Sequence, residues 1–167
     1  MSKVHARVAV AVVVAVVGVG WVSAQERGGS SPPALTGQDY EQIKELYARY
    51  NQGSDFRDVE LYLSAFADDA VITRGERETV GMAALRAERV ERYAGETGDN
   101  GRRHHNNSWI ITPTATGAKA RTYWLVLDVG TQPPTPASTG SYDDTFTRTL
   151  KGWRIQTRTL HPDGVAR

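Results

Sequence analysis

The spacing of hydrophobic positions changes near residue 100, and this change predicts the fold class. Before residue 100, apolar side chains recur every three or four positions, as on the buried face of a helix. After it, they alternate with polar residues or form short runs rich in Val, Ile, Tyr and Trp, as in strands. Helices followed by long antiparallel strands are typical of an α+β fold. We therefore predict a cone-shaped α+β barrel, in which three N-terminal helices pack in a curved, mostly antiparallel sheet.

Three segments have helical spacing. Thr36 followed by Asp39 is typical of a helix start, because each side chain can bind the other residue's backbone N–H. The apolar positions that follow continue to Tyr50, and the polar and glycine residues 51–53 predict the end of this helix. The second helix is predicted over residues 58–66 and the third over 82–93, before Gly95.

The remaining segments predict strands and turns. A short strand is expected at 70–73, with a turn or an edge strand at 75–78. Three prolines within 130–140 predict a loop there, since proline cannot donate to a sheet. The four long strands are predicted at 103–114, 118–129, 142–150 and 153–160, the last two joined by a hairpin turn at Lys151-Gly152.

The N-terminal segment is typical of an export signal. Its basic start precedes an almost wholly Val, Ala and Gly stretch over 8–19, and Val22-Ser23-Ala24 supplies small residues before a cleavage point after Ala24. The apolar stretch is shorter than the roughly 20 residues of a membrane span, although an uncleaved anchor is the alternative. We expect a secreted or periplasmic protein with a signal peptide at 1–24, a Gly-, Ser- and Pro-rich linker at 25–35, one domain at 36–163 and a tail at 164–167.

Composition narrows the function classes. The net charge of +1 and the scattered arginines argue against a nucleic-acid or membrane-surface protein. The chain has no cysteine, which excludes disulfides, thiol catalysis and thiolate metal sites.

The polar stretch before Trp109 carries the clearest candidate chemistry. Alternation along a strand places His104, Asn106 and Ser108 on one face, and His105, Asn107 and Trp109 on the other. A polar row on a strand that enters the core is typical of a cavity lining, and a solvated outer face is the alternative. We predict that His104 or His105 is a general base.

Four segments carry a family resemblance: Gly53 to Asp55 with 62–71, Arg103-His104-His105, Gly140 to Phe146, and Gly152 to Ile155. Together they resemble the SnoaL-like domain of the nuclear transport factor 2 superfamily, and the resemblance extends over residues 38–158. This family contains dehydratases, isomerases, cyclases, dehydrochlorinases and members that only bind a ligand. It implies a conical ligand pocket and a homodimer.

Within the family, the resemblance is strongest to the branch of scytalone dehydratase, bile-acid 7α-dehydratase and hexachlorocyclohexane dehydrochlorinase. Asp55 and His104 match the positions of the paired Asp and His of these enzymes, and Tyr50 matches a polar position five residues before the Asp. An imidazole suits proton abstraction near neutral pH, and a carboxylate on its other nitrogen fixes the tautomer. The resemblance implies that this acid–base chemistry requires no metal and no organic cofactor.

The resemblance also implies a set of substrate-binding residues and a small hydrophobic or cyclic substrate. Arg158 matches an Arg on the last strand, and an apolar pocket wall is expected from Tyr47, Phe66, Trp109 and Trp124. The full candidate set for substrate binding is His105, Asn106, Trp124, Asp128 and Arg158.

Each candidate residue also has a structural explanation. Asp55 is placed to cap the second helix, Tyr50 lies on an apolar helix face, and Asp128 with Arg158 would form a cross-strand ion pair. Three functions therefore stay open: an exported dehydratase-like lyase or isomerase, a non-catalytic small-molecule binding domain, and an assembly module.

Overall fold

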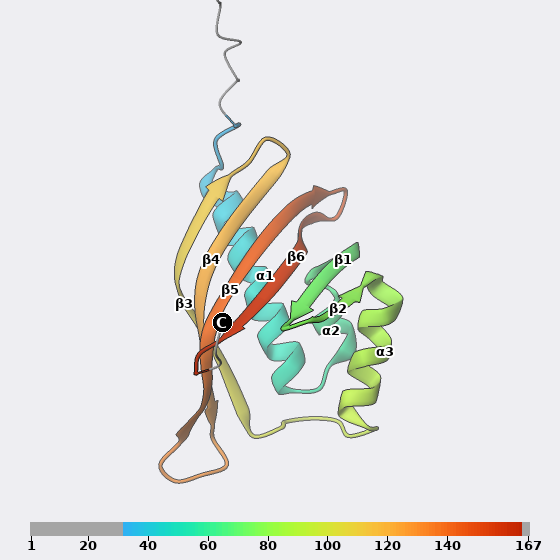
Figure 1. The fold of residues 1–167 in the computed structure, drawn as a ribbon, viewed down its shortest axis with the longest axis vertical. Helices are drawn as coiled ribbons and strands as arrows, with labels where there is room; N and C mark the ends of the chain where they lie inside the picture. Colours follow the sequence, from blue (N-terminus) through green and yellow to red (C-terminus); the bar gives the residue numbers. More distant parts are fainter. Residues whose placement is uncertain (1–31, 165–167) are drawn as a thin grey trace, which may run out of the picture. The chain divides into compact units, whose positions relative to one another are not determined.

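Three helices and six strands form within residues 32–164, the part of the chain that the computed structural model describes (Figure 1). The α+β class is confirmed. The predicted signal peptide and most of the predicted linker lie outside the described residues. No helix among residues 32–164 has the length and apolar character needed to cross a membrane. The elements are α1 (Gly37–Asp55), α2 (Val59–Leu63), β1 (Phe66–Arg74), β2 (Arg77–Val80), α3 (Gly81–Tyr93), β3 (Arg102–Pro113), β4 (Gly117–Asp128), β5 (Thr135–Thr149) and β6 (Gly152–Pro162).

The strands form one mixed sheet in the order β2-β1-β6-β5-β4-β3. Strands β3 to β6 pair antiparallel, as predicted, whereas β1 pairs parallel with β6 and antiparallel with β2. Helix α1 lies along one face of the sheet, and α3 lies beside the β1–β2 end (Figure 1). Helix α3 and strand β3 therefore lie at opposite edges of the sheet, and α1 packs on the face between them.

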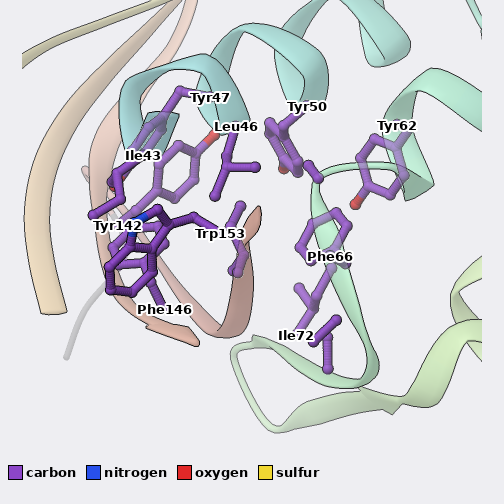
Figure 2. Packing of buried hydrophobic residues seen from close by; sticks show 14 of the residues in the cluster. Ile43, Leu46, Tyr47, Tyr50, Tyr62, Phe66, Ile72, Tyr142, Phe146 and Trp153 are labelled. Carbon is purple, nitrogen blue, oxygen red and sulfur yellow. The ribbon is translucent and has the colours of Figure 1, made fainter. Parts of the chain in front are cut away.

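Helix α1 begins at the predicted capping box. The Thr36 hydroxyl accepts a bond from Asp39 N at 3.2 Å, and the Asp39 carboxylate accepts one from Thr36 N at 2.9 Å. The apolar face of the helix then packs on the sheet and contributes Ile43, Leu46, Tyr47 and Tyr50 to an aromatic-rich core (Figure 2). Burial of this face, worth roughly 1.5–3 kcal/mol for each large side chain, fixes the helix against the sheet.

The C-terminal ends of α1 and α2 both differ from the prediction. Helix α1 continues past this glycine to Asp55. A Cβ at Gly53 would lie 2.4 Å from the backbone nitrogen of Tyr62, so the glycine permits the close approach of α2 and does not end α1. Helix α2 ends at Leu63, because Phe66 already belongs to β1, where it pairs with Ile155 of β6.

The predicted proline loop is also shorter than expected. Strand β5 already begins at Thr135, and Pro136 lies opposite Leu127 at a register shift in β4. The pairing of β5 with β6 reaches only to Gly140, opposite Pro162. Pro136 therefore lies where β5 has a single neighbour, the kind of edge position where strands tolerate proline.

Candidate functional site

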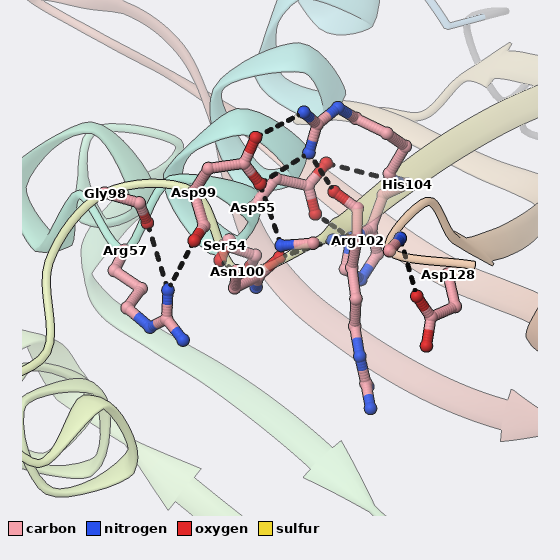
Figure 3. Close-up of polar contacts among 12 residues, drawn as sticks. Ser54, Asp55, Arg57, Gly98, Asp99, Asn100, Arg102, His104 and Asp128 are labelled. Atoms are coloured by element: carbon pink, nitrogen blue, oxygen red, sulfur yellow. Dashed lines mark hydrogen bonds and ion pairs between the residues drawn. The ribbon is translucent and has the colours of Figure 1, made fainter. Parts of the chain in front are cut away.

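Asp55 and His104 meet where α1 ends and β3 begins (Figure 3). One carboxylate oxygen of Asp55 accepts a bond from His104 N at 2.9 Å, and the other lies 2.5 Å from His104 Nδ1. An ionised carboxylate only accepts hydrogen bonds, so Nδ1 carries the proton in the neutral imidazole and Nε2 presents a lone pair. Within the described residues Nε2 has no hydrogen-bond partner from the protein.

Asp55 does not cap the second helix. That position belongs to Asp58, whose side chain accepts a bond from Leu61 N at 2.9 Å. Asp55 is instead the last residue of α1, and it is 3% exposed. Its carboxylate is therefore free to hold the histidine.

The loop between α3 and β3 holds the end of α1 in place. The backbone N–H of Asn100 donates to Asp55 O at 2.9 Å, and its side-chain amide donates to Ser54 O at 2.9 Å. Arg57 in turn donates to the carbonyl oxygens of Gly98 and Asp99 (Figure 3). These bonds fix the backbone that carries Asp55, and with it the direction of its carboxylate.

His104 lines a cavity of about 530 Å³ that is built from both helical and sheet elements. This volume is in the range of small-molecule pockets. Trp124 and Tyr142 form one wall, with their rings stacked at 5.8 Å and an angle of 22°. The other lining residues are Tyr50, Ser54, Arg57, Arg74, Arg89, Arg92, Tyr93, Ala94, Glu96, Asn100, Arg102, Val126, Ser138 and Leu160.

Tyr50 lies next to the histidine within this lining. Its ring centroid is 6.5 Å from that of His104, with the two planes at 88°. Burial by itself would raise the pKa of the Tyr50 phenol, but the positive charges of nearby arginines, first among them Arg158, hold this pKa below its ordinary value. Burial raises the pKa of the neighbouring Tyr142 well above the ordinary value. Tyr50 is therefore the more acidic phenol of the two.

Arg158 lies behind the cavity wall. Its side chain is fully buried, and its Nε and Nη2 donate to the two carboxylate oxygens of Asp144 at 2.9 and 2.8 Å. The rings of Tyr50 and Tyr142 cover the guanidinium at 4.3 and 4.1 Å. The structure thus places Arg158 outside the cavity lining and against the aromatic side chains that form it. The cross-strand pair of Arg158 with Asp128 is wrong, since Asp144 is its partner.

Three other predicted residues lie away from the cavity lining. The side chain of His105 is exposed on the opposite side of β3. Asn106 accepts a bond from the amide of Asn51 at 2.7 Å. Asp128 accepts one from Gly130 N at 2.9 Å. Of the predicted site residues, the cavity brings together His104, Tyr50 and Trp124, with Asp55 directly behind the histidine.

The predicted alternation of side chains along β3 fails at Ser108. This residue has a φ of 55°, and the register with β4 shifts between Asn107 and Ile110. Such a bulge moves the following side chain to the other face. Trp109 therefore lies on the helix side of the sheet, where its ring packs edge-on against that of Tyr47 of α1 with 6.4 Å between the ring centroids.

Five arginines in the cavity lining were not predicted from the sequence. They come from the turn after α1, the end of β1, α3 and the start of β3. The sequence holds one signal for them, since Arg89 and Arg92 are three residues apart on the third helix and so share a face. The others come together only in the folded chain. They are Arg57, Arg74, Arg89, Arg92 and Arg102.

Solved structures with the same fold include proteins from several bacteria. A protein of unknown function with a cystatin-like fold from Nostoc punctiforme is 25% identical, with a TM-score of 0.70 over 79% of this chain and 96% of that one. An NTF2-like protein from Novosphingobium aromaticivorans is 26% identical, with a TM-score of 0.63 over 77% and 85%. ActVI-ORFA from Streptomyces coelicolor is 21% identical, with a TM-score of 0.64 over 75% and 98%, and shows the fold alone.

No match to this sequence was found among curated proteins. The sequence profile of the SnoaL-like domain matches residues 36–159, which is most of the chain. This match agrees with the NTF2-like, cystatin-like fold of the solved structures. The protein therefore belongs to the SnoaL-like domain family.

Proposed function

We propose that this protein is an exported, cofactor-independent lyase or isomerase that acts on a small cyclic or hydrophobic substrate. The observation that carries the proposal is the 2.5 Å contact between Asp55 Oδ1 and His104 Nδ1, on a histidine that lines the cavity. The carboxylate holds the tautomer in which Nε2 can take a proton, and it stabilises the imidazolium that results.

The proposed reaction is an elimination. His104 Nε2 removes a proton from a carbon next to an electron-withdrawing group, and the electron pair of that C–H bond forms a C=C bond as the C–O bond of the leaving hydroxyl breaks. Tyr50 gives its phenolic proton to the departing oxygen, so that water leaves. The proton on His104 then returns to the Tyr50 phenolate. An isomerase would use the same base and return the proton to a different carbon.

Two further features support this assignment. The arginine charges that lower the pKa of Tyr50 make it a better acid than an ordinary buried tyrosine. The stacked rings of Trp124 and Tyr142 contribute aromatic surface to the cavity lining, which suits a cyclic substrate. The family itself includes dehydratases and isomerases, as well as members that only bind ligands.

The test uses cyclic β-hydroxy ketones and thioesters as a substrate panel, with wild type compared to His104→Ala and Asp55→Asn. For an active compound, we expect His104→Ala to lower kcat about 10²- to 10⁴-fold, the usual contribution of a general base. Binding of the same compound, measured by quenching of tryptophan fluorescence, should change only a few-fold. The matched control is His105→Ala, on the neighbouring exposed histidine.

Two results would contradict the proposal. Turnover that survives His104→Ala would remove the histidine from the reaction. Tight binding without turnover over the whole panel, together with loss of binding in His104→Ala, would instead favour a small-molecule binding domain.

A further inference from the structure

The charges around the cavity point to the chemical class of its ligand. Among the lining side chains, five are arginines and only Glu96 is a carboxylate. Glu96 is already paired with Arg57 at 2.5 Å. The remaining arginines belong to the α3 side of the cavity and to the start of β3.

Three of these arginines share a single carboxylate. Glu88 lies 3.1 Å from Arg74, 3.7 Å from Arg89 and 4.0 Å from Arg92. One negative charge cannot balance three guanidinium groups, so this cluster carries an excess of two positive charges. Arg102 has no ion pair among residues 32–164 and adds a further positive charge at the cavity. The electrostatic potential inside the cavity is therefore positive.

Two buried hydrogen-bond donors on lining side chains have no acceptor within residues 32–164. Arg89 is 5% exposed and Trp124 is 7% exposed, yet the Arg89 Nε–H and the Trp124 Nε1–H both lack a partner in this described part of the chain. Buried donors normally have partners, because leaving one unpaired costs free energy. The Arg89 side chain is held in place by a 2.7 Å bond from its Nη2 to the hydroxyl of Tyr62. The side chains that carry these donors line the cavity, one from α3 and one from β4.

We infer that the natural ligand is an organic anion, with its carboxylate or phosphate group bound on the α3 side by Arg89, Arg92 and Arg74. This inference rests on the proposed function, because it names the substrate class of the same site. An anionic group at this position would offer an acceptor to Arg89 and balance the excess charge. The ring of the ligand then lies against Trp124 and Tyr142, between the arginines and His104. In Figure 1, α3 and the start of β3 lie on opposite sides of the end of α1, which fits a ligand that reaches from one to the other.

The binding test compares benzoate with benzamide, which has the same size and no charge. We expect wild type to bind benzoate at least about tenfold more tightly, as measured by NMR titration of the backbone amides. The variant Arg92→Gln should reduce that preference to about threefold or less. Arg92 is a suitable site because its side chain is 57% exposed and lies outside the buried core. Arg89→Gln is a poorer test because its side chain is buried and holds Tyr62.

The matched control is Arg86→Gln. Arg86 is on the same helix, is similarly exposed and pairs with Glu60 outside the cavity. The benzoate preference should survive this change. An equal loss in both variants would mean that only the overall charge matters, and would overturn the inference, as would equal binding of benzamide and benzoate by wild type. Tighter binding of phenyl phosphate, with the same dependence on Arg92, would support the inference and identify phosphate as the anionic group.

The two proposals fail in different ways. A benzoate preference that depends on Arg92, combined with turnover that is insensitive to His104→Ala, would leave the anion site in place and remove the proposed chemistry. Loss of turnover in His104→Ala with no preference for anions would leave the proposed chemistry in place and remove the anion site.

Discussion

Asp55 and Asp144 each hold a basic side chain from a neighbouring strand, but only one of these pairs adjoins open space. Asp144 and Arg158 are both fully buried at the side-chain level and form two parallel hydrogen bonds. Asp55 is equally hidden, but the side chain of His104 is 17% exposed and lines the cavity. The two pairs are alike in chemistry and differ in access.

This difference in access distinguishes a pair that supports the fold from a pair that can take part in a reaction. An arginine stays protonated at all ordinary pH values, so the sealed pair cannot exchange a proton with a ligand. Its charge acts at short range instead, on the rings of Tyr50 and Tyr142. A histidine beside a cavity can gain and lose a proton near neutral pH. We therefore expect changes to the sealed pair to act on stability, and changes to the open pair to act on turnover.

The largest effect is expected from Arg158→Met. The substitution leaves the Asp144 carboxylate buried without its ion-pair partner, which should lower the free energy of unfolding by about 3–5 kcal/mol. The measurement is urea unfolding at neutral pH. The loss comes from the unpaired charge of Asp144. The double variant Arg158→Met with Asp144→Leu should therefore recover part of the lost free energy of unfolding.

The adjacent aspartate supplies the control for Arg158→Met. Asp143 binds Arg121 through two bonds of 2.7 Å each, but on the exposed face of the sheet. Arg121→Met should therefore cost less than about 1 kcal/mol. Similar losses for the two arginines would show that burial does not distinguish the pairs.

A smaller stability effect is expected from Asp55→Asn. The asparagine keeps the size of the side chain and can still accept the bond from His104 N, but it loses the charge-assisted bond to Nδ1. The expected loss is about 1–2 kcal/mol by urea unfolding. A loss as large as that of Arg158→Met would identify the open pair as a second structural pair.

The sequence predicted the parts of the site that depend on short spacing or on family resemblance. Thr36 and Asp39 form the predicted cap because the capping box requires only four consecutive positions. Asp55 and His104 are 49 positions apart, and no local rule joins them. The family resemblance singled them out, and the structure places them in contact.

The parts of the site that were not predicted depend on strand order, on strand register and on elements far apart in the chain. Arg158 was assigned a partner on the wrong strand. Asp128 belongs to β4, which is not adjacent to β6, whereas Asp144 lies directly opposite Arg158 on the neighbouring β5. A single positive φ at Ser108 similarly moved Trp109 to the other face. The five cavity arginines come from the turn after α1 and from β1, α3 and β3, so that no single segment of the chain displays the whole set.

Asp39, at the opposite end of α1 from Asp55, is a third carboxylate to compare, because its contribution to stability depends on pH. Its carboxylate accepts a 2.9 Å bond from the indole of Trp153, whose ring has no second nitrogen to exchange a proton. That bond, followed by the one from Thr36 N, lowers the pKa of Asp39 from 3.8 to about 2. A carboxyl with a lowered pKa contributes stability above its unfolded value, and this contribution is lost as the pH falls from about 4 to about 2.

The corresponding prediction is that Asp39→Asn lowers the urea midpoint at pH 7 and reduces its dependence on pH between 4 and 2. Part of that dependence should remain, because the pKa of Asp99 is also lowered to about 2, chiefly by its bond with Arg103. An unchanged slope in the variant would mean that the Asp39 carboxylate gains nothing from Trp153 when the chain folds. A reduced slope without loss of turnover would place Asp39 with Asp144, as a carboxylate that supports the fold, and leave Asp55 as the one that serves the cavity.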